Sequence, residues 1–192
     1  KSGSALGEGV GPLLISQNPD IVKPTSEWRV VLPGEMTTAH LLFTLAYPDV
    51  QYKSHVLFSD IEQALIEEKF DVGVIIHENR FTYQAKGLYK ILDLGDYWEQ
   101  KYKVPIPLGG IAAHNSLTKE ERRCIEDDIG RSIAYAFTNP SASNNYVKHH
   151  AQEMDERVRM RHIETYVNDY SLNLGQDGLK AINALRKAAN RI

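Results

Sequence analysis

The sequence predicts an α/β protein with a mainly parallel sheet. Two observations support this class. Short apolar or alternating segments, typical of strands, are separated by segments with helical spacing as far as about residue 114, and only helical patterns follow. Strands that alternate with helices favour βαβ units, with helices on the faces of the sheet. Because ligands bind at the carboxyl ends of the strands in such sheets, functional residues are expected there.

Six segments are predicted as strands, each rich in apolar residues or alternating in polarity. Turn-forming residues close some of them, such as the Pro33–Gly34 pair at the end of the second. The six segments are residues 11–16, 28–34, 50–58, 72–76, 89–95 and 106–114.

Helices are predicted from their start signals and from apolar residues at helical spacing. Capping-box patterns, Ser59 with Glu62 and Thr118 with Glu121, mark two of the starts. The predicted helices cover residues 37–48, a short segment after Ser59, residues 118–137, residues 158–170 and residues 179–185.

The composition is that of a globular protein, with 42% hydrophobic and 24% charged residues in 192. A formal net charge of -3 gives no basic surface for nucleic acid. No apolar run approaches the roughly 20 residues of a membrane span. Cys124 is the one cysteine, so an intrachain disulfide and a cysteine-rich zinc site are excluded. A cytoplasmic protein is expected, and nothing in the pattern specifies an oligomeric state.

The segment "DVGVIIHENRFTY", residues 71–83, places His77 directly after a buried strand. A histidine titrates near neutral pH, so His77 could act as a general base at a crevice. The alternative is a structural histidine, hydrogen-bonded near the edge of the sheet. If the strand continued, Glu78 and Arg80 would point to the face opposite His77, so an ion-paired surface is expected for them.

The segment "PGEMTTAH", residues 33–40, follows a strand and opens a helix. Free N–H groups at a helix start, together with the hydroxyls of Thr37 and Thr38, suit a carboxylate or phosphate. The alternative is that a threonine only caps the helix. His40 lies among apolar residues and is expected in the core or at an interface.

Other glycines and histidines give weaker signals. The run "GEGVG", residues 7–11, lacks the spacing of a dinucleotide fingerprint; its glycines, like those of "PLGGI" at 107–111, are expected to permit an unusual backbone path, close to a ligand. His149 and His150 are adjacent, without the spacing of a zinc motif, so no metal site is expected. The isolated histidines are expected to be surface or structural residues: His55, His114 and His162.

Several blocks, taken in order, resemble one enzyme family. They are the glycine run, "RVVLPGEMTTAHLL", "GVIIHENRFTY", "GLYKILDLGDYWEQKYKVPIPLGGIAAH" and "HAQEM…HIETYVNDYSLNLG". The chain resembles the 1,4-dihydroxy-6-naphthoate synthases of the futalosine route to menaquinone over nearly its whole length. The resemblance implies a periplasmic-binding-protein-like type II fold, with two α/β domains around a cleft. It also implies a cytoplasmic carbon–carbon lyase that acts on cyclic dehypoxanthine futalosine and needs no cofactor.

The resemblance also implies roles for three residues. The histidine of the "IIHE" block, here His77, corresponds to the family's proposed catalytic base. The threonine of the "TTA" block corresponds to Thr38, a ligand contact, with Thr37 beside it. The expected partner is therefore a small-molecule carboxylate substrate, and no metal is expected.

The sequence departs from the family pattern at its start. Family members carry further chain before the glycine run, including a Pro-Asn-Asp loop near the cleft, and this chain opens on Lys1. Residues 28–112 are expected to form the second domain, and residues 1–24 and 114–192 what remains of the first, whose N-terminal part is missing. The 192-residue chain alone is expected to be inactive or unstable.

Two other functions share this fold. Chorismate dehydratase of the same pathway shares some motifs, although the "IIHE" and "DLGDYWE" blocks favour the synthase. A solute-binding protein captures its ligand without chemistry and needs no base in the cleft.

Overall fold

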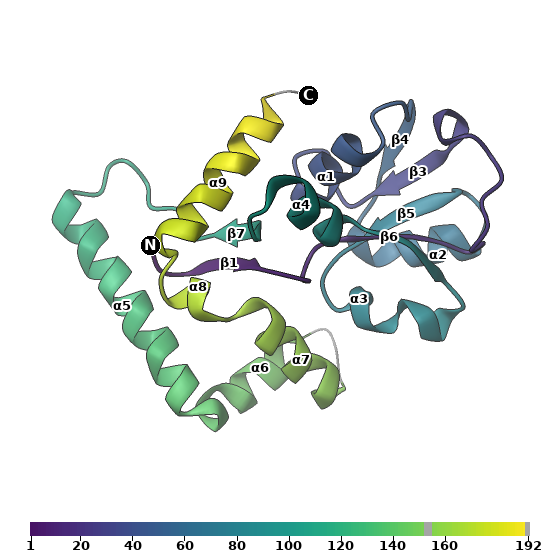
Figure 1. Ribbon diagram of the computed structural model, residues 1–192. Coiled ribbons are helices and arrows are strands. Elements are labelled where there is room, and N and C mark those ends of the chain that lie inside the picture. The colour runs from purple at the N-terminus through teal and green to yellow at the C-terminus, as the bar shows by residue number, and fades with distance from the viewer. Residues whose placement is uncertain (152–154, 191–192) are drawn as a thin grey trace.

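A computed structural model describes residues 1–151 and 155–190 of the chain (Figure 1). Two sheets organise these residues. The larger sheet holds, in spatial order, β4 (Tyr52–His55), β3 (Arg29–Leu32), β5 (Val72–Ile75), β2 (Leu13–Ser16) and β6 (Tyr89–Asp93). The smaller sheet pairs β1 (Ser4–Gly7) with β7 (Ile106–Gly110) in antiparallel register.

The larger sheet is mainly parallel, as predicted. Strand β3 is parallel to β4 and β5, and β2 is antiparallel to both β5 and β6, so β3, β4, β5 and β6 share one direction. Strand β2 runs the other way because residues 17–28 connect it to β3 with only the 3-10 turn Thr25–Glu27 and no crossover helix. The carboxyl ends of β3, β5 and β6 therefore meet at the edge where β2 begins.

Apolar residues alternate along the strands of the larger sheet and fill a core on each face. Leu14, Val30 and Val74 join the cluster that contains α1 (Thr38–Ala46) and α4 (Leu94–Tyr102). Their neighbours Ile15, Val31 and Ile75 join the cluster that contains α2 (Ile61–Ile66). This period-2 pattern explains why these segments form strands covered by helices on both faces.

The six predicted strands are all present, each shorter than predicted. Strand β1 and helix α4 were not predicted. The expected strand over residues 89–95 ends at Asp93, whose carboxylate accepts hydrogen bonds from the backbone N–H groups of Gly95 and Asp96 and caps α4. Local capping thus stops the strand earlier than its apolar pattern indicates.

The two predicted capping boxes have different outcomes. Thr118 and Glu121 form the reciprocal box at the start of α5 (Lys119–Thr138), as predicted. The box at Ser59 and Glu62 is wrong, because a 3-10 turn, Phe58–Asp60, precedes α2 and the Ser59 hydroxyl donates to Asp60. Glu62 is buried, and its carboxylate accepts hydrogen bonds from Lys86 and Asn79.

After β7 the described chain is helical, as predicted. The predicted helix over 158–170 is two helices, because the side chain of Asn168 caps a second start. The helices after α5 are α6 (Asn144–His150), α7 (Glu156–Tyr166), α8 (Asp169–Leu172) and α9 (Gly175–Ala189), with the 3-10 turn Pro140–Ser143 before α6. Figure 1 shows α5 at the outside of the smaller sheet, on the side away from the larger one.

The chain passes between the sheets at residues 8–12 and 103–105 (Figure 1). The predicted boundaries assign β2 to the first domain, but it lies in the larger sheet, whose other strands belong to the second. They assign β7 to the second domain, but it pairs with β1 of the first. The division itself into residues 28–112 and the flanking segments stays a prediction. Among the described residues, no helix has the length and apolar character needed to cross a membrane.

Candidate functional site

A cavity of about 570 Å³ opens where the carboxyl edge of the larger sheet faces the smaller sheet and α7. The segments after β3 and β5 and before β2 line one side of this cavity, and residues of β1, β7 and α7 line the other. The lining residues are Ala5, Val10, Gly11, Pro12, Met36, Thr37, Thr38, Ala39, Ile76, His77, Leu108, Gly109, His162 and Tyr166. The cavity therefore includes all three residues that the sequence predicts as a site.

His77 has a left-handed backbone conformation, with φ of 57°. Strand β5 ends at Ile75, and His77 opens a turn that leads into α3 (Asn79–Thr82). A non-glycine residue in this region costs about 1–2 kcal/mol, and such strain persists where surrounding structure maintains it, often at functional sites. The exposed imidazole lines the cavity, and the Phe58 ring contacts it edge-on at 5.2 Å between centroids.

The prediction of an ion-paired surface at Glu78 and Arg80 is wrong, because the strand does not continue past Ile75. The Arg80 side chain is only 14% exposed and pairs with the buried Asp93 carboxylate at 2.7 Å. It also donates to the backbone carbonyls of Gly9, at 2.8 Å, and Gly11. The half-buried Glu78 lines a second, smaller cavity beside His77.

Thr37 and Thr38 differ in their hydrogen bonds. The Thr37 hydroxyl donates to the carbonyl of Gly34 at 2.7 Å and accepts from the backbone N–H of His40 at 3.2 Å, so it caps α1. Among the described residues, the Thr38 hydroxyl has no protein partner. Both threonines line the cavity at the start of α1, where the first N–H groups have no intrahelical acceptors. Thr38 is thus the hydroxyl available to a ligand.

The glycine run has the unusual backbone path that was predicted. Gly9 has a φ of 66°, and its N–H donates to the carboxylate of Glu99 at 2.8 Å. Gly11 packs so closely on Gly95 that a side chain at position 11 would lie 2.3 Å from the Gly95 Cα atom. This packing brings Gly11 to the edge of the cavity, while its proximity to a ligand stays a prediction.

His162 and Tyr166 were not predicted as site residues. His162 lies on α7, half-buried, with its ring centroid 6.2 Å from that of His77. Burial lowers the pKa of His162, and the neighbouring His77 lowers it further, against the opposing effect of Glu78. Burial raises the pKa of the Tyr166 hydroxyl. The one sequence feature that could have indicated these two site residues is their four-residue spacing, because it places both rings on one face of a helix.

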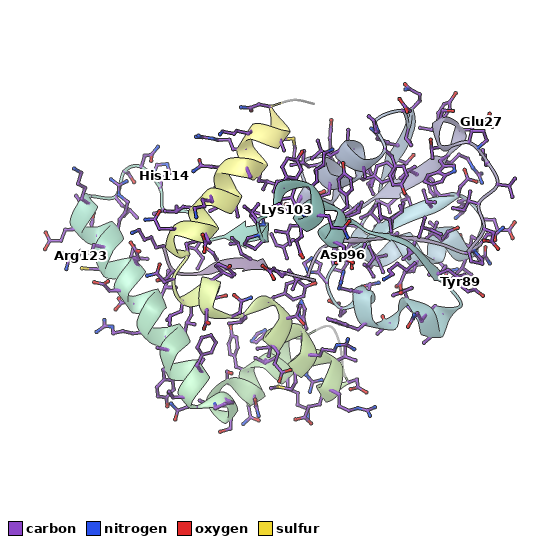
Figure 2. The ribbon with its side chains drawn as sticks, in the orientation of Figure 1. Glu27, Tyr89, Asp96, Lys103, His114 and Arg123 are labelled. Carbon is purple, nitrogen blue, oxygen red and sulfur yellow. The ribbon has the colours of Figure 1, made fainter. Side chains whose placement is uncertain are left out.

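The remaining histidines lie outside the cavity. His40 is half-buried on α1, and its Nδ1 lies 3.0 Å from Nε2 of the exposed His55. Burial, then His55, lowers the pKa of His40. His114 lies in the exposed connection between β7 and α5 (Figure 2).

His149 and His150 make ring contacts with each other at the end of α6. The Gln152–Met154 part of the "HAQEM" block lies outside the described residues. Within residues 1–151 and 155–190, no three His, Cys, Asp or Glu side chains are grouped to hold a metal ion.

The fold and the cavity define a periplasmic-binding-protein-like protein of type II. The ligand-binding component of an ABC-type import system from Staphylococcus aureus matches with a TM-score of 0.63 at 13% identity, over 100% of this chain and 68% of that one. The periplasmic aliphatic sulphonate binding protein of Escherichia coli matches with a TM-score of 0.59 at 10% identity, over 98% and 63%. These two likenesses concern the fold alone.

The chain belongs to the menaquinone biosynthesis family, whose model matches residues 1–191. The 1,4-dihydroxy-6-naphthoate synthase of Thermus thermophilus is 38% identical over 96% of this chain and 67% of that protein. The enzyme of the same name from Streptomyces coelicolor is 41% identical over 95% and 66%. A crystal structure of a protein from Archaeoglobus fulgidus, 33% identical, has a TM-score of 0.90 over 99% and 70%. The chain thus spans about two thirds of these proteins, and the predicted family is confirmed.

Proposed function

We propose that this chain provides catalytic and substrate-binding residues of a 1,4-dihydroxy-6-naphthoate synthase, a carbon–carbon lyase of menaquinone biosynthesis. Its substrate would be cyclic dehypoxanthine futalosine, and its products 1,4-dihydroxy-6-naphthoate and a small sugar-derived fragment. The observation that carries the proposal is that His77 and Thr38 line one cavity, in a chain 38% and 41% identical to two synthases. A base and a carboxylate-binding position are the two elements that this reaction requires.

In this proposal His77 is the general base. Its imidazole is exposed to the cavity and lies beyond the end of the strand, where the left-handed turn directs the chain away from the sheet. Histidine exchanges protons near neutral pH, so it can accept one from the substrate while the carbon–carbon bond breaks. Formation of an aromatic ring supplies the driving force, and the protein contributes positioning and a proton acceptor. The proposed step requires no metal or organic cofactor.

Thr38 would bind the aryl carboxylate of the substrate. Its hydroxyl is available, and the helix start directs N–H groups and the positive end of the helix dipole toward the same region. Thr37 would act mainly through the cap that shapes this turn.

A biosynthetic role of this kind favours a cytoplasmic location for the protein.

Turnover of two substrates tests the proposal against its alternatives. We expect the intact protein to convert cyclic dehypoxanthine futalosine to 1,4-dihydroxy-6-naphthoate, detected by chromatography and mass spectrometry, and to leave chorismate unchanged. Dehydration of chorismate would instead identify the sibling dehydratase. Binding of either compound without turnover would identify a solute-binding protein.

A further inference from the structure

His77 and His162 belong to segments far apart in the sequence and meet at the cavity. Both residues line the 570 Å³ cavity, and both also line a second cavity of about 260 Å³. Their rings meet edge to face, with an interplanar angle of 88°. Among the described residues no hydrogen bond joins the two imidazoles. The ring nitrogens of one imidazole therefore do not use the other ring as a hydrogen-bond partner.

Each of these rings contacts an aromatic neighbour. Tyr166, one turn further along α7, contacts the His162 ring at 4.7 Å between centroids. Phe58 contacts the His77 ring from the turn before α2. Edge-on arrangements are a preferred geometry of aromatic pairs. These contacts therefore favour one orientation of each imidazole at the cavity.

Burial and the neighbouring His77 favour the uncharged form of His162, whereas Glu78 favours the charged form. His77 and Glu78 face it from the turn after β5, Tyr166 from its own helix, and Arg159 lines the smaller cavity with it. Burial is the largest influence and lowers the pKa of His162. A neutral imidazole has one N–H group that can donate a hydrogen bond. It also adds no positive charge beside His77, which becomes charged when it accepts a proton.

We propose that His162 donates a hydrogen bond to the substrate oxygen on which negative charge develops while His77 accepts the proton. This inference rests on the proposed function. His77 takes the proton of a substrate hydroxyl, a carbonyl forms on the departing fragment, and the adjoining carbon–carbon bond breaks. The bonding electron pair passes into the ring of the substrate and onto the carbonyl oxygen of that ring. His162 stabilises the negative charge on this oxygen. The proton on His77 then passes to that oxygen, so the step is balanced and redox-neutral.

Two variants of His162 in the intact protein separate hydrogen bonding from packing. His162→Gln keeps an N–H donor but no ring, and His162→Phe keeps the ring against Tyr166 but no donor. We expect kcat to fall about 100-fold in His162→Phe and less than about 10-fold in His162→Gln, with KM within about threefold in both. His114→Phe, in the exposed connection between β7 and α5, is the matched control and should keep the wild-type kcat.

A third variant covers the case in which His162→Phe does not fold. His162→Ala should lose turnover to a similar extent and regain part of it with added imidazole, because the small molecule can restore the donor. Equal or better turnover by His162→Phe than by His162→Gln, a loss confined to KM, or absence of imidazole rescue in a folded His162→Ala would overturn the inference. Absence of turnover in the wild type would overturn the proposed function as well, which distinguishes the two failures.

Discussion

At the scale of single residues, the site depends on both the backbone conformation of His77 and its imidazole. The sequence places a histidine after a buried strand, which was enough to predict its position at the edge of the sheet. The positive φ was not predictable, because few non-glycine residues adopt it and no glycine marks the turn. His162 was missed for another reason: it lies 85 positions after His77 in the sequence, and only the tertiary fold brings the rings together.

Thr38 provides a prediction at this scale. Thr38→Val keeps the shape of the side chain but removes the available hydroxyl, so KM for the carboxylate substrate should rise about 5- to 30-fold, equivalent to about 1–2 kcal/mol. The value of kcat should change less than about threefold, because the carboxylate is unchanged in the reaction. Steady-state kinetics measures both constants.

Thr37→Val is the matched control for Thr38→Val. Because the Thr37 hydroxyl caps α1, this change should cost about 1 kcal/mol of stability and lower Tm by about 2–4 °C. An unchanged KM in Thr38→Val would remove Thr38 from the binding position.

At the scale of elements, the apolar strands were predictable and helix α4 was not. Strands β2, β3 and β5 are fully or almost fully buried, so their hydrophobic pattern is strong. The stretch Leu94–Tyr102 mixes polar and aromatic residues, and its first residue completes an alternating Leu-Asp-Leu pattern that resembles a continued strand. The capping hydrogen bonds of Asp93 mark the helix start. They are local, but an aspartate within an alternating pattern is compatible with a strand as well as with a helix cap.

Asp71 connects two elements of the larger sheet and gives a prediction about pH. Its carboxylate lies just before β5 and accepts hydrogen bonds from the backbone and side chain of Arg29 in β3, and from Lys23. Burial alone would raise the pKa of Asp71, but these bonds lower it to about 2. A carboxyl group whose pKa is lower in the folded state stabilises the fold above its unfolded pKa of about 3.9.

Asp71→Asn should therefore lower the free energy of unfolding by about 2 kcal/mol at pH 7. The difference from the wild type should shrink as the pH falls from about 4 toward 2, where the carboxyl group of the folded wild type is about half protonated. Urea unfolding across this pH range measures it. Asp49→Asn, at an exposed position, is the control and should have little effect at any pH. A difference that persists unchanged at pH 2 would show that the charge of Asp71 is not its cause.

At the scale of the whole molecule, Arg80 fixes the passage of the chain between the two sheets. Arg80 donates hydrogen bonds to the carbonyls of Gly9 and Gly11, in the segment after β1. It also pairs with Asp93 at the end of β6, so it connects the two segments. The passage lines the cavity, so its position determines the distance between the two sides of the site. The order of the sequence blocks identified the family and hence the fold, whereas this buried pair was not predictable from the spacing of its members.

Arg80→Met tests the role of this buried pair. It leaves the Asp93 carboxylate buried with fewer partners, so we expect a loss of about 3–5 kcal/mol in the free energy of unfolding. Arg123→Met removes an arginine from an exposed ion pair on α5 and should cost less than about 0.5 kcal/mol. Urea denaturation of both variants gives the comparison. A loss below about 1 kcal/mol in Arg80→Met would contradict a structural role for the pair.

The central claim is that His77 is the base of a synthase, and the single-turnover rate of His77→Asn tests it most directly. Asparagine tolerates the left-handed conformation at this position and hydrogen-bonds, but it cannot accept a proton near neutral pH. We predict that turnover of cyclic dehypoxanthine futalosine falls about 10²- to 10⁴-fold, while Tm stays within a few degrees of the wild type and the affinity for product within about threefold. Near-normal turnover by the folded variant would contradict the claim and make His77 a structural residue.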